Sequence, residues 1–376
     1  MNPKPGDLPF PDVHLRSPSR VKENRVRGGS VSRVISHAFL QPVPSRSTGF
    51  YVCIKKGAEV MSVKWKKRWG LLCLSLLLVL GAVGCAPSGG TEGRLNTPVK
   101  PSAVKYPVEV TDQAGNKVTI KQEPKRIVSL MPSNTEIAYA LGLDQKMVGV
   151  TTNDDYPAAV KKLPKVGDFK INVEKVVSLK PDLVLANGAN DKATLEQLKK
   201  LGIPVLVLDA KSFKDIYRSI AIIATATNTA READLLIAKM QKEHRDIYAK
   251  VVNVPKDQRV KVFVELDPTL YTVGGDTFMN ELVTTAGGVN VAAGLKGWPQ
   301  VSAEQVVKWN PDIIISSYGS TDQILKRQGW STVNAIKGKR VYVVDPNLTN
   351  RPGPRIFQGV KEMAEQFYPE RFGEQK

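Results

Sequence analysis

Val173-Glu-Lys-Val-Val-Ser-Leu-Lys-Pro-Asp-Leu-Val-Leu185 is echoed 130 positions later by Ala303-Glu-Gln-Val-Val-Lys-Trp-Asn-Pro-Asp-Ile-Ile-Ile315, with five identities in thirteen. In both stretches a short helical pattern ends at Pro-Asp and an apolar run follows. Proline has no amide hydrogen and ends a helix, whereas a short run of apolar residues is typical of a buried strand. The repeated helix–turn–strand unit predicts two α/β lobes of similar build.

Further short apolar strands surround each copy of the repeat. They are predicted at 126–130, 147–151, 183–186, 205–208, 260–264, 313–316 and 340–344. The residues between them predict helices at 138–141 (capped by Ser133 or Asn134), 173–179, 195–201, 277–286 and 303–309. Residues 106–120 alternate around Gly115-Asn116 and predict a hairpin. Strands that are apolar throughout belong to parallel sheets with helices on both faces.

One long helix is predicted between the two halves. Residues 229–252 contain no Gly or Pro, and their apolar residues recur at close to 3.6 positions. Such a helix spans roughly 35 Å and would join the lobes, with His244 as a partly buried residue on it. The fold class is therefore α/β, with two Rossmann-like lobes joined by one long helix and a ligand in the cleft between them. The loops expected to line that cleft are 131–134, 186–190, 267–275 and 316–321.

Composition excludes several functional classes. The net charge of +18 comes largely from the N-terminal region, and the remaining body has no run of more than two adjacent Lys or Arg residues, unlike a nucleic-acid binder. No cysteine follows Cys85, and the body holds a single histidine, His244, so we expect no metal centre, no resident cofactor and no catalytic residues. No phosphate-binding glycine loop is present.

The N-terminal region resembles an export signal. Basic residues at 64–68 precede an apolar run over 71–80 that is too short to span a membrane but suits a signal peptide. Small residues then lead to Cys85, in a pattern similar to the bacterial lipobox, which implies lipidation of that cysteine. The predicted organisation is a non-native or disordered extension at 1–60, a lipoprotein signal peptide at 61–84, a flexible tether at 85–105, an N-terminal lobe at 106–228, a connecting helix at 229–254 and a C-terminal lobe at 255–376.

Seven fragments in order resemble the class III, helical-backbone substrate-binding proteins of ABC importers, which serve cobalamin, ferric siderophores and haem. The fragments are 126–136, 155–157, 164–168, 179–184, 286–290, 298–302 and 351–355. The resemblance implies an extracytoplasmic lipoprotein, not an enzyme, that is attached to the membrane by its lipid. It also implies an ABC permease with its ATPase as partner, a small-molecule chelate as ligand, and no nucleic acid. We expect a monomer.

The ligand site is predicted from the cleft loops and from the resemblance. The predicted ligand-binding residues are Ser133, Asn134, Phe169, Asn187, Tyr271, Trp298, Tyr318, Asn347 and Arg351. Flat chelates need aromatic faces and a few polar anchors. For permease docking, the resemblance implies one exposed acid on each lobe. The position in the first lobe holds Lys192, so Asp191 or Glu196 is expected to substitute, and Asp322 is expected in the second lobe.

The sequence favours cobalamin or a related corrinoid as ligand. Residues 132–136 and 298–302 are most similar to cobalamin-type members, and corrin amide side chains suit neutral asparagine donors and acceptors. Against this, Asn187 stands where an aromatic residue is expected. A ferric siderophore or haem remains the alternative ligand, and an enzyme on the same scaffold is a weaker alternative.

Overall fold

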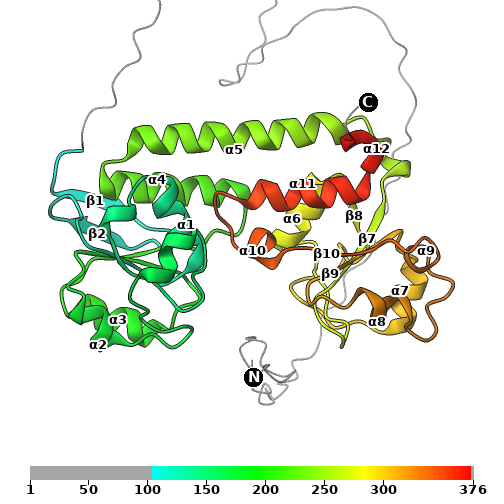
Figure 1. Cartoon of the computed structure of the whole chain (residues 1–376), viewed down its shortest axis with the longest axis horizontal. Helices are drawn as coiled ribbons and strands as arrows, with labels where there is room; N and C mark the ends of the chain where they lie inside the picture. The colour runs from blue at the N-terminus through cyan, green and yellow to red at the C-terminus, as the bar shows by residue number, and fades with distance from the viewer. Residues whose placement is uncertain (1–103, 374–376) are drawn as a thin grey trace, which may run out of the picture. The chain divides into compact units, whose positions relative to one another are not determined.

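The computed structural model describes residues 104–373 (Figure 1). The predicted extension, signal peptide and lipidation at Cys85, together with almost all of the tether, lie outside the described residues. Within the described part, two parallel sheets and a hairpin are present. The strands are β1 (Val108–Thr111), β2 (Lys117–Ile120), β3 (Ile127–Ser129), β4 (Met147–Gly149), β5 (Leu183–Ala186), β6 (Val205–Val207), β7 (Lys261–Glu265), β8 (Val289–Asn290), β9 (Ile313–Ser316) and β10 (Val341–Val343).

The two lobes share one topology, as the repeat predicts. The first sheet has the order β4-β3-β5-β6 and the second β8-β7-β9-β10, and every neighbouring pair is parallel. In each lobe the chain therefore starts at a central strand, adds one strand on one side, and returns to the other side for the third and fourth. The strand order reverses between β3 and β5 and between β7 and β9, which is where open parallel sheets bind ligands.

Helices cover both faces of each sheet. They are α1 (Pro132–Ala140), α2 (Val173–Ser178), α3 (Lys192–Lys200), α4 (Phe213–Thr227), α5 (Ala230–Val251), α6 (Phe278–Thr285), α7 (Ala303–Trp309), α8 (Thr321–Leu325), α9 (Asn334–Lys337), α10 (Pro346–Thr349), α11 (Ile356–Phe367) and α12 (Pro369–Phe372). Figure 1 shows α5 running along one side of the body, with α4 beneath one half of it and α11 beneath the other. This layer joins the two lobes.

The buried strand residues alternate between two sides of each sheet. On β5, Leu183 and Leu185 enter a core shared with α4, α5 and α11, whereas Val184 and Ala186 face a separate core under α2 and α3. On β9, Ile313 and Ile315 enter the same shared core, and Ile314 faces the core under α7 and α8. Successive strand residues point to opposite faces, so burial on both faces requires the continuous apolar runs seen in the sequence. The shared core continues through both lobes.

The repeat performs the same local task in each lobe. Asn172 and Ser302 cap α2 and α7 with their side chains. Asp182 then accepts hydrogen bonds from the backbone amides of Lys125 and Arg126 at the start of β3, and Asp312 accepts one from Lys261 at the start of β7. The Pro-Asp turns thus fasten the third strand of each lobe to its first.

Several sequence predictions are corrected. Neither Ser133 nor Asn134 caps α1, because the helix already begins at Pro132. Its N-cap is Met131, which supplies no side-chain hydrogen bond. Two long helices, α4 and α11, were not predicted. His244 is partly buried on α5, as expected, and stacks on Phe357 of α11 at 5.0 Å between ring centroids.

Two absences concern residues 104–373 alone. No helix in that range has the length and apolar character needed to cross a bilayer. The same residues contain no cluster of three or more His, Cys, Asp or Glu side chains arranged to hold a metal ion.

Replacing Asp182 or Asp312 with alanine should destabilise the protein by about 1–2 kcal/mol each, because backbone amides at the start of a central strand lose a charged acceptor. The two sites lie in different lobes, so their effects should add in the double variant. Thermal or urea unfolding followed by circular dichroism measures this. Asp246→Ala, which removes an exposed pair with Lys242, is the matched control and should cost less than about 0.5 kcal/mol. Equal stability of all variants would contradict the assigned role of the turns.

Candidate functional site

Charged side chains connect the two lobes at the carboxyl ends of their strands. Glu136 of α1 is buried, and Arg355 binds it through two hydrogen bonds, Nε to Oε2 at 2.8 Å and Nη2 to Oε1 at 2.6 Å. Arg351 also reaches Glu136 Oε1, at 3.3 Å. A buried carboxylate is costly unless it is paired and hydrogen-bonded, and here both partners come from the other lobe. We call Glu136, Arg351 and Arg355 the interlobe latch.

Beside the latch, Arg351 forms a second, more exposed ion pair with Asp155, which we call the Asp155 arm. Arg351 Nη1 lies 2.6 Å from Asp155 Oδ1, and Nη2 donates to the carbonyl of Asn153 at 3.2 Å. Both acceptors lie in the loop after β4. The guanidinium of Arg355 lies 3.9 Å from the centre of the Tyr156 ring, in cation–π geometry. The structure shows that Arg351 connects the lobes, and its predicted contact with the ligand stays a prediction.

The Asp155 arm is intact at neutral pH. The hydrogen bond from Arg351 lowers the pKa of the Asp155 carboxyl below its ordinary value. A lowered pKa in the folded state means that the pair stabilises the protein above the unfolded pKa of about 3.9 and loses that contribution as the pH falls through the folded value. The arm therefore holds across the whole neutral range.

The predicted asparagines are engaged by the backbone. Asn134 Nδ2 donates to the carbonyl of Ala186 at 2.9 Å, and Asn187 Nδ2 donates to that of Leu208 at 2.6 Å. Asn190 accepts from the amide of Asn187 and donates to the Leu130 carbonyl. These bonds tie the loops after β3 and β5 together. They leave these asparagines fewer free donors for a ligand than the sequence suggested.

Two further predicted polar residues lie near the latch. Ser133 is buried in the first turn of α1, beneath the segment that carries Gly353. Asn347 is partly buried on α10, and its carbonyl accepts a long hydrogen bond of 3.4 Å from Arg355. The roles of both residues in binding stay predictions.

Phe169 projects from the first lobe. Its side chain is 60% exposed at the tip of a tight loop after β4, closed by the bridge between Gly167 and Ile171. Gly167 has φ +119°, and a Cβ there would lie 2.3 Å from the Lys170 carbonyl oxygen, so only glycine makes this turn. The backbone thus holds the Phe169 ring in an exposed position at the tip of the loop.

Tyr271 and Trp298 lie on two paired loops of the second lobe. Tyr271 forms a bridge with Gln300, and the amide of Gly274 donates to the Gly297 carbonyl at 2.8 Å. A Cβ on Gly274 would lie 2.5 Å from the Leu295 carbonyl oxygen, so glycine permits this close approach. Trp298 is 65% exposed and Tyr271 is also exposed. The second lobe therefore has its own exposed aromatic surface.

Tyr318 follows β9 and is partly buried. Its hydroxyl donates to Glu265, the last residue of β7, which also binds Arg327 through two hydrogen bonds of 2.8 and 2.6 Å. Burial and the hydrogen bond to Glu265 raise the pKa of the Tyr318 phenol far above its ordinary value. The sequence pointed to Tyr318 but gave no sign of its two partners.

The acids predicted for permease docking have different environments. Asp191 is the N-cap of α3 and accepts from the amide and hydroxyl of Thr194, both at 2.9 Å. Glu196 pairs with Lys199 on the same helix. Asp322 is exposed in the first turn of α8. Asp191 and Glu196 thus have local helix-stabilising partners.

The sequence prediction did not include two groups of exposed residues, which are Tyr156 and the pair Glu174 and Glu304. Tyr156 stacks on the latch and is exposed, and the motif 155–157 was the signal for it. Glu174 and Glu304 occupy the same position of the repeat, each in the first turn of its helix, exposed and without an ion-pair partner among residues 104–373. The identity of the repeat at that position was the available signal.

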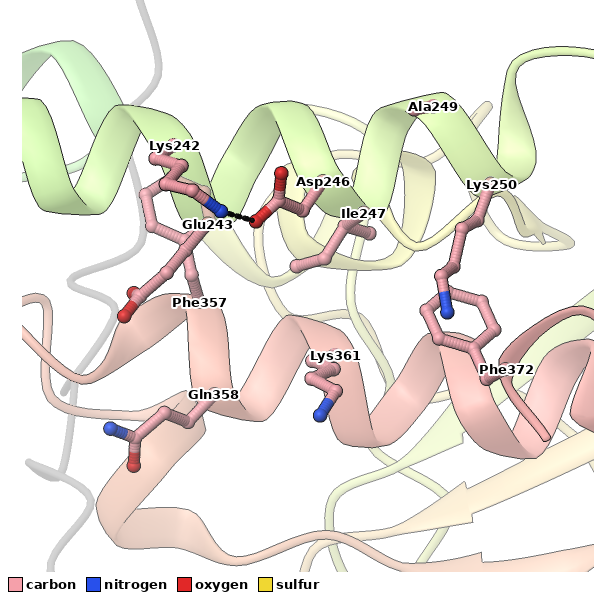
Figure 2. Close-up of a pocket in the computed structure, with 10 residues that line it drawn as sticks. All are labelled: Lys242, Glu243, Asp246, Ile247, Ala249, Lys250, Phe357, Gln358, Lys361 and Phe372. Atoms are coloured by element: carbon pink, nitrogen blue, oxygen red, sulfur yellow. Dashed lines mark hydrogen bonds and ion pairs between the residues drawn. The ribbon is translucent and has the colours of Figure 1, made fainter. Parts of the chain in front are cut away.

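Two hollows in the described chain lie away from these loops. One, of about 750 Å³, runs between α5 and α11 (Figure 2), where Lys242 pairs with Asp246 at 2.7 Å and Lys250 lies 4.6 Å from the centre of the Phe372 ring. The other, of about 450 Å³, lies beside β2 and β6. Neither is lined by a residue predicted to bind the ligand.

The comparisons with known proteins agree with this architecture. The family model described as periplasmic binding protein matches residues 127–348. The chain belongs to this family. It is 47% identical over 316 residues to an uncharacterized ABC transporter substrate-binding lipoprotein of Bacillus subtilis (strain 168), covering 82% of this chain and 100% of the relative. It is 35% identical over 260 residues to the vitamin B12-binding protein of Vibrio vulnificus (strain CMCP6), covering 66% of this chain and 93% of the relative.

A solved structure shows the same fold. A possible iron-binding, periplasmic solute-binding protein from Staphylococcus epidermidis ATCC 12228 is 36% identical, with a TM-score of 0.60, over 66% of this chain and 100% of that one. The prediction of two lobes in class III arrangement is thereby confirmed. The chain is an ABC transporter substrate-binding protein, and its relatives, which include vitamin B12-binding proteins, are transport proteins and not enzymes.

Glu136→Gln should destabilise the protein by about 2–4 kcal/mol, because two largely buried arginines lose their shared carboxylate. For a body of this size that is a fall of roughly 5–15 °C in melting temperature. Asp155→Asn is the matched control at the exposed arm and should cost less than about 1 kcal/mol. Differential scanning calorimetry of wild type, Glu136→Gln and Asp155→Asn measures these changes. A Glu136→Gln protein as stable as wild type would show that the interlobe latch does not contribute to stability.

Proposed function

We propose that this chain captures cobalamin or a related corrinoid outside the cytoplasmic membrane and delivers it to an ABC permease. The ligand would lie between the two lobes, against the loops at the carboxyl ends of the strands. The 35% identity to a vitamin B12-binding protein supports the ligand class. The observation that carries the choice of ligand is the state of the arginines at these loops.

Each of these arginines already has a carboxylate partner. Arg351 binds Glu136 and Asp155, Arg355 binds Glu136, and Arg327 binds Glu265. Anionic chelates such as catecholate siderophores are held by cations with free hydrogen-bonding capacity. A corrin with neutral amide side chains needs no such cations. The pairing of the arginines therefore favours a neutral ligand.

Exposed aromatic rings on both lobes supply the faces for a flat macrocycle. Phe169 stands on the first lobe, and Tyr271 and Trp298 on the second, all exposed. Each ring–macrocycle contact contributes about 0.5–1.5 kcal/mol beyond the area that it buries. Asn187 offers no such face, which leaves the stacking surface of the first lobe to Phe169 and Tyr156.

Delivery requires a surface that the permease recognises on both lobes. Glu174 and Glu304 fit this requirement better than Asp191 and Asp322, because the repeat places the two glutamates at equivalent positions of the two lobes and both are exposed. The hydrogen bond from Ser302 lowers the pKa of Glu304, which keeps its charge at neutral pH. We propose this pair as the docking acids for basic residues of the permease.

We propose that Cys85 is the lipidated N-terminus of the mature protein. The signal-like sequence before it supports this, as does the relative named as a substrate-binding lipoprotein. The tether of about twenty residues would then link the lipid to a monomeric body facing away from the cytoplasm. Residues 1–84 would be absent from the mature product.

Titration of residues 86–376 with cyanocobalamin, a ferric catecholate siderophore and haemin tests the proposal. Cyanocobalamin should bind with a dissociation constant below about 1 μM, which corresponds to about 8 kcal/mol. Isothermal calorimetry and quenching of tryptophan fluorescence give independent readouts. Tight siderophore or haemin binding, with cyanocobalamin weaker than about 10 μM, would overturn the corrinoid choice.

Trp298 provides the matched variant for that titration. Trp298→Ala should weaken cyanocobalamin binding by roughly 2- to 10-fold, the equivalent of one stacking contact, and leave the melting temperature unchanged because the ring is exposed. Leu235→Ala, at an exposed apolar position on α5, is the control and should alter neither quantity. A Trp298→Ala protein that melts earlier but binds normally would show a structural role.

A ferric siderophore is the second candidate because two exposed lysines flank the aromatic residues. Lys170 follows Phe169 and Lys296 precedes Trp298, and neither has an ion-pair partner among the described residues. They offer one free cation on each lobe to an anionic chelate. In the titration above, a siderophore that binds tightly to wild type and loses affinity in a Lys170→Gln, Lys296→Gln variant would support this candidate.

A further inference from the structure

Glu265 lies where the second sheet reverses its strand order. It is the last residue of β7, fully buried, and its neighbour β9 leads directly to Tyr318. Carboxylates are almost never fully buried unless they are paired. Arg327 supplies both halves of a two-pronged pair, and the Tyr318 hydroxyl donates to the same carboxylate. We call these three residues the Glu265 triad.

The triad packs against the hydrophobic core of the second lobe. The guanidinium of Arg327 lies 4.3 Å from the centre of the Trp330 ring, and Trp330 is fully buried. Tyr318 packs partly on the same core and keeps part of its surface exposed. A guanidinium fixed by two hydrogen bonds and an aromatic face has little freedom to move. The position of the Tyr318 ring is therefore set by its partners.

This arrangement determines what the phenol oxygen can do. To coordinate a ferric ion, Tyr318 would have to lose its proton and its hydrogen bond to Glu265. A phenolate would then lie beside the buried Glu265 carboxylate, and like charges repel. Arg327 Nη2 lies 3.4 Å from the Tyr318 hydroxyl, but its charge is already shared with Glu265 through two shorter hydrogen bonds. Burial first, and then the hydrogen bond to Glu265 and its negative charge, raise the pKa of the phenol, and Arg327 offsets part of that rise.

We infer that Glu265 and Arg327 are positioning residues that present the Tyr318 ring to the ligand as a contact surface and withhold its oxygen from the ligand's metal. The inference rests on the proposed function in that the ligand is a metal chelate. The inference narrows the class of bound molecule. The metal ion of any chelate that contacts Tyr318 must have all of its coordination positions filled by the chelate itself or by a group other than Tyr318. A corrinoid with both axial positions filled meets that condition.

The first test concerns the triad alone. Tyrosine ionisation is followed by ultraviolet absorbance during pH titration of wild type, Tyr318→Phe and Glu265→Gln. The difference between wild type and Tyr318→Phe should show one tyrosine that ionises far above the ordinary value of about 10, and Glu265→Gln should bring that ionisation closer to 10. Because Glu265→Gln leaves Arg327 unpaired, the double variant E265Q/R327Q replaces it if the single variant does not fold. A Tyr318 that ionises near 10 in wild type would overturn the inference.

The second test concerns the ligand. Cyanocobalamin affinity should stay within about 2-fold of wild type in Tyr318→Phe, which keeps the ring, and fall roughly 2- to 10-fold in Tyr318→Leu, which loses it. The absorption spectrum of a haemin complex should be the same for wild type and Tyr318→Phe. A phenolate–iron band that disappears in Tyr318→Phe would overturn the inference. Failure of every variant to bind either chelate would contradict the proposed function, whereas the tyrosine titration would still report on the triad.

Discussion

A carboxylate buried away from water must find partners, and Glu136 finds both of its partners in the other lobe. Arg351 and Arg355 cross from the segment after β10 to reach it, and the loop after β4 accepts the remaining donors of Arg351. On the opposite side, α4, α5 and α11 enclose one core that both sheets share. The lobes are therefore connected twice, by charge near the strand ends and by apolar packing along the helices. A body held at two places offers its ligand a surface that is largely preformed.

Preformed sites bind without a large cost of ordering, and the loops of this chain fit that description. Asparagine side chains bond to the backbone of neighbouring loops, glycines permit the tight turns under Phe169 and beside Trp298, and the Glu265 triad fixes Tyr318. Most of these polar side chains bond to the protein itself, while aromatic rings are among the side chains that the loops expose. This division suits a large ligand with a broad apolar face and its own hydrogen-bonding periphery.

The fold could be predicted from the sequence wherever a local pattern carried it. Apolar runs gave the strands because both faces of each sheet are covered, and the repeat predicted matched turns at Asp182 and Asp312. The helices α4 and α11 were missed although Ser212 caps one and a regular apolar stripe marks the other. The latch and the triad could not be predicted, since Arg355 and Glu136 lie 219 positions apart and only the folded chain brings them together. For Asn134 and Asn187 the residue type suggested ligand binding, but in the folded chain their side chains donate to backbone carbonyls.

We propose that the ligand binds between lobes that stay connected by the interlobe latch. A crystal structure of residues 86–376 with cyanocobalamin tests this most directly. The account predicts a corrin that touches Phe169 on one lobe and Trp298 on the other, with Arg355 still bonded to Glu136. A corrin seated in the groove between α5 and α11, or lobes that have separated with the Arg355–Glu136 pair broken, would contradict it.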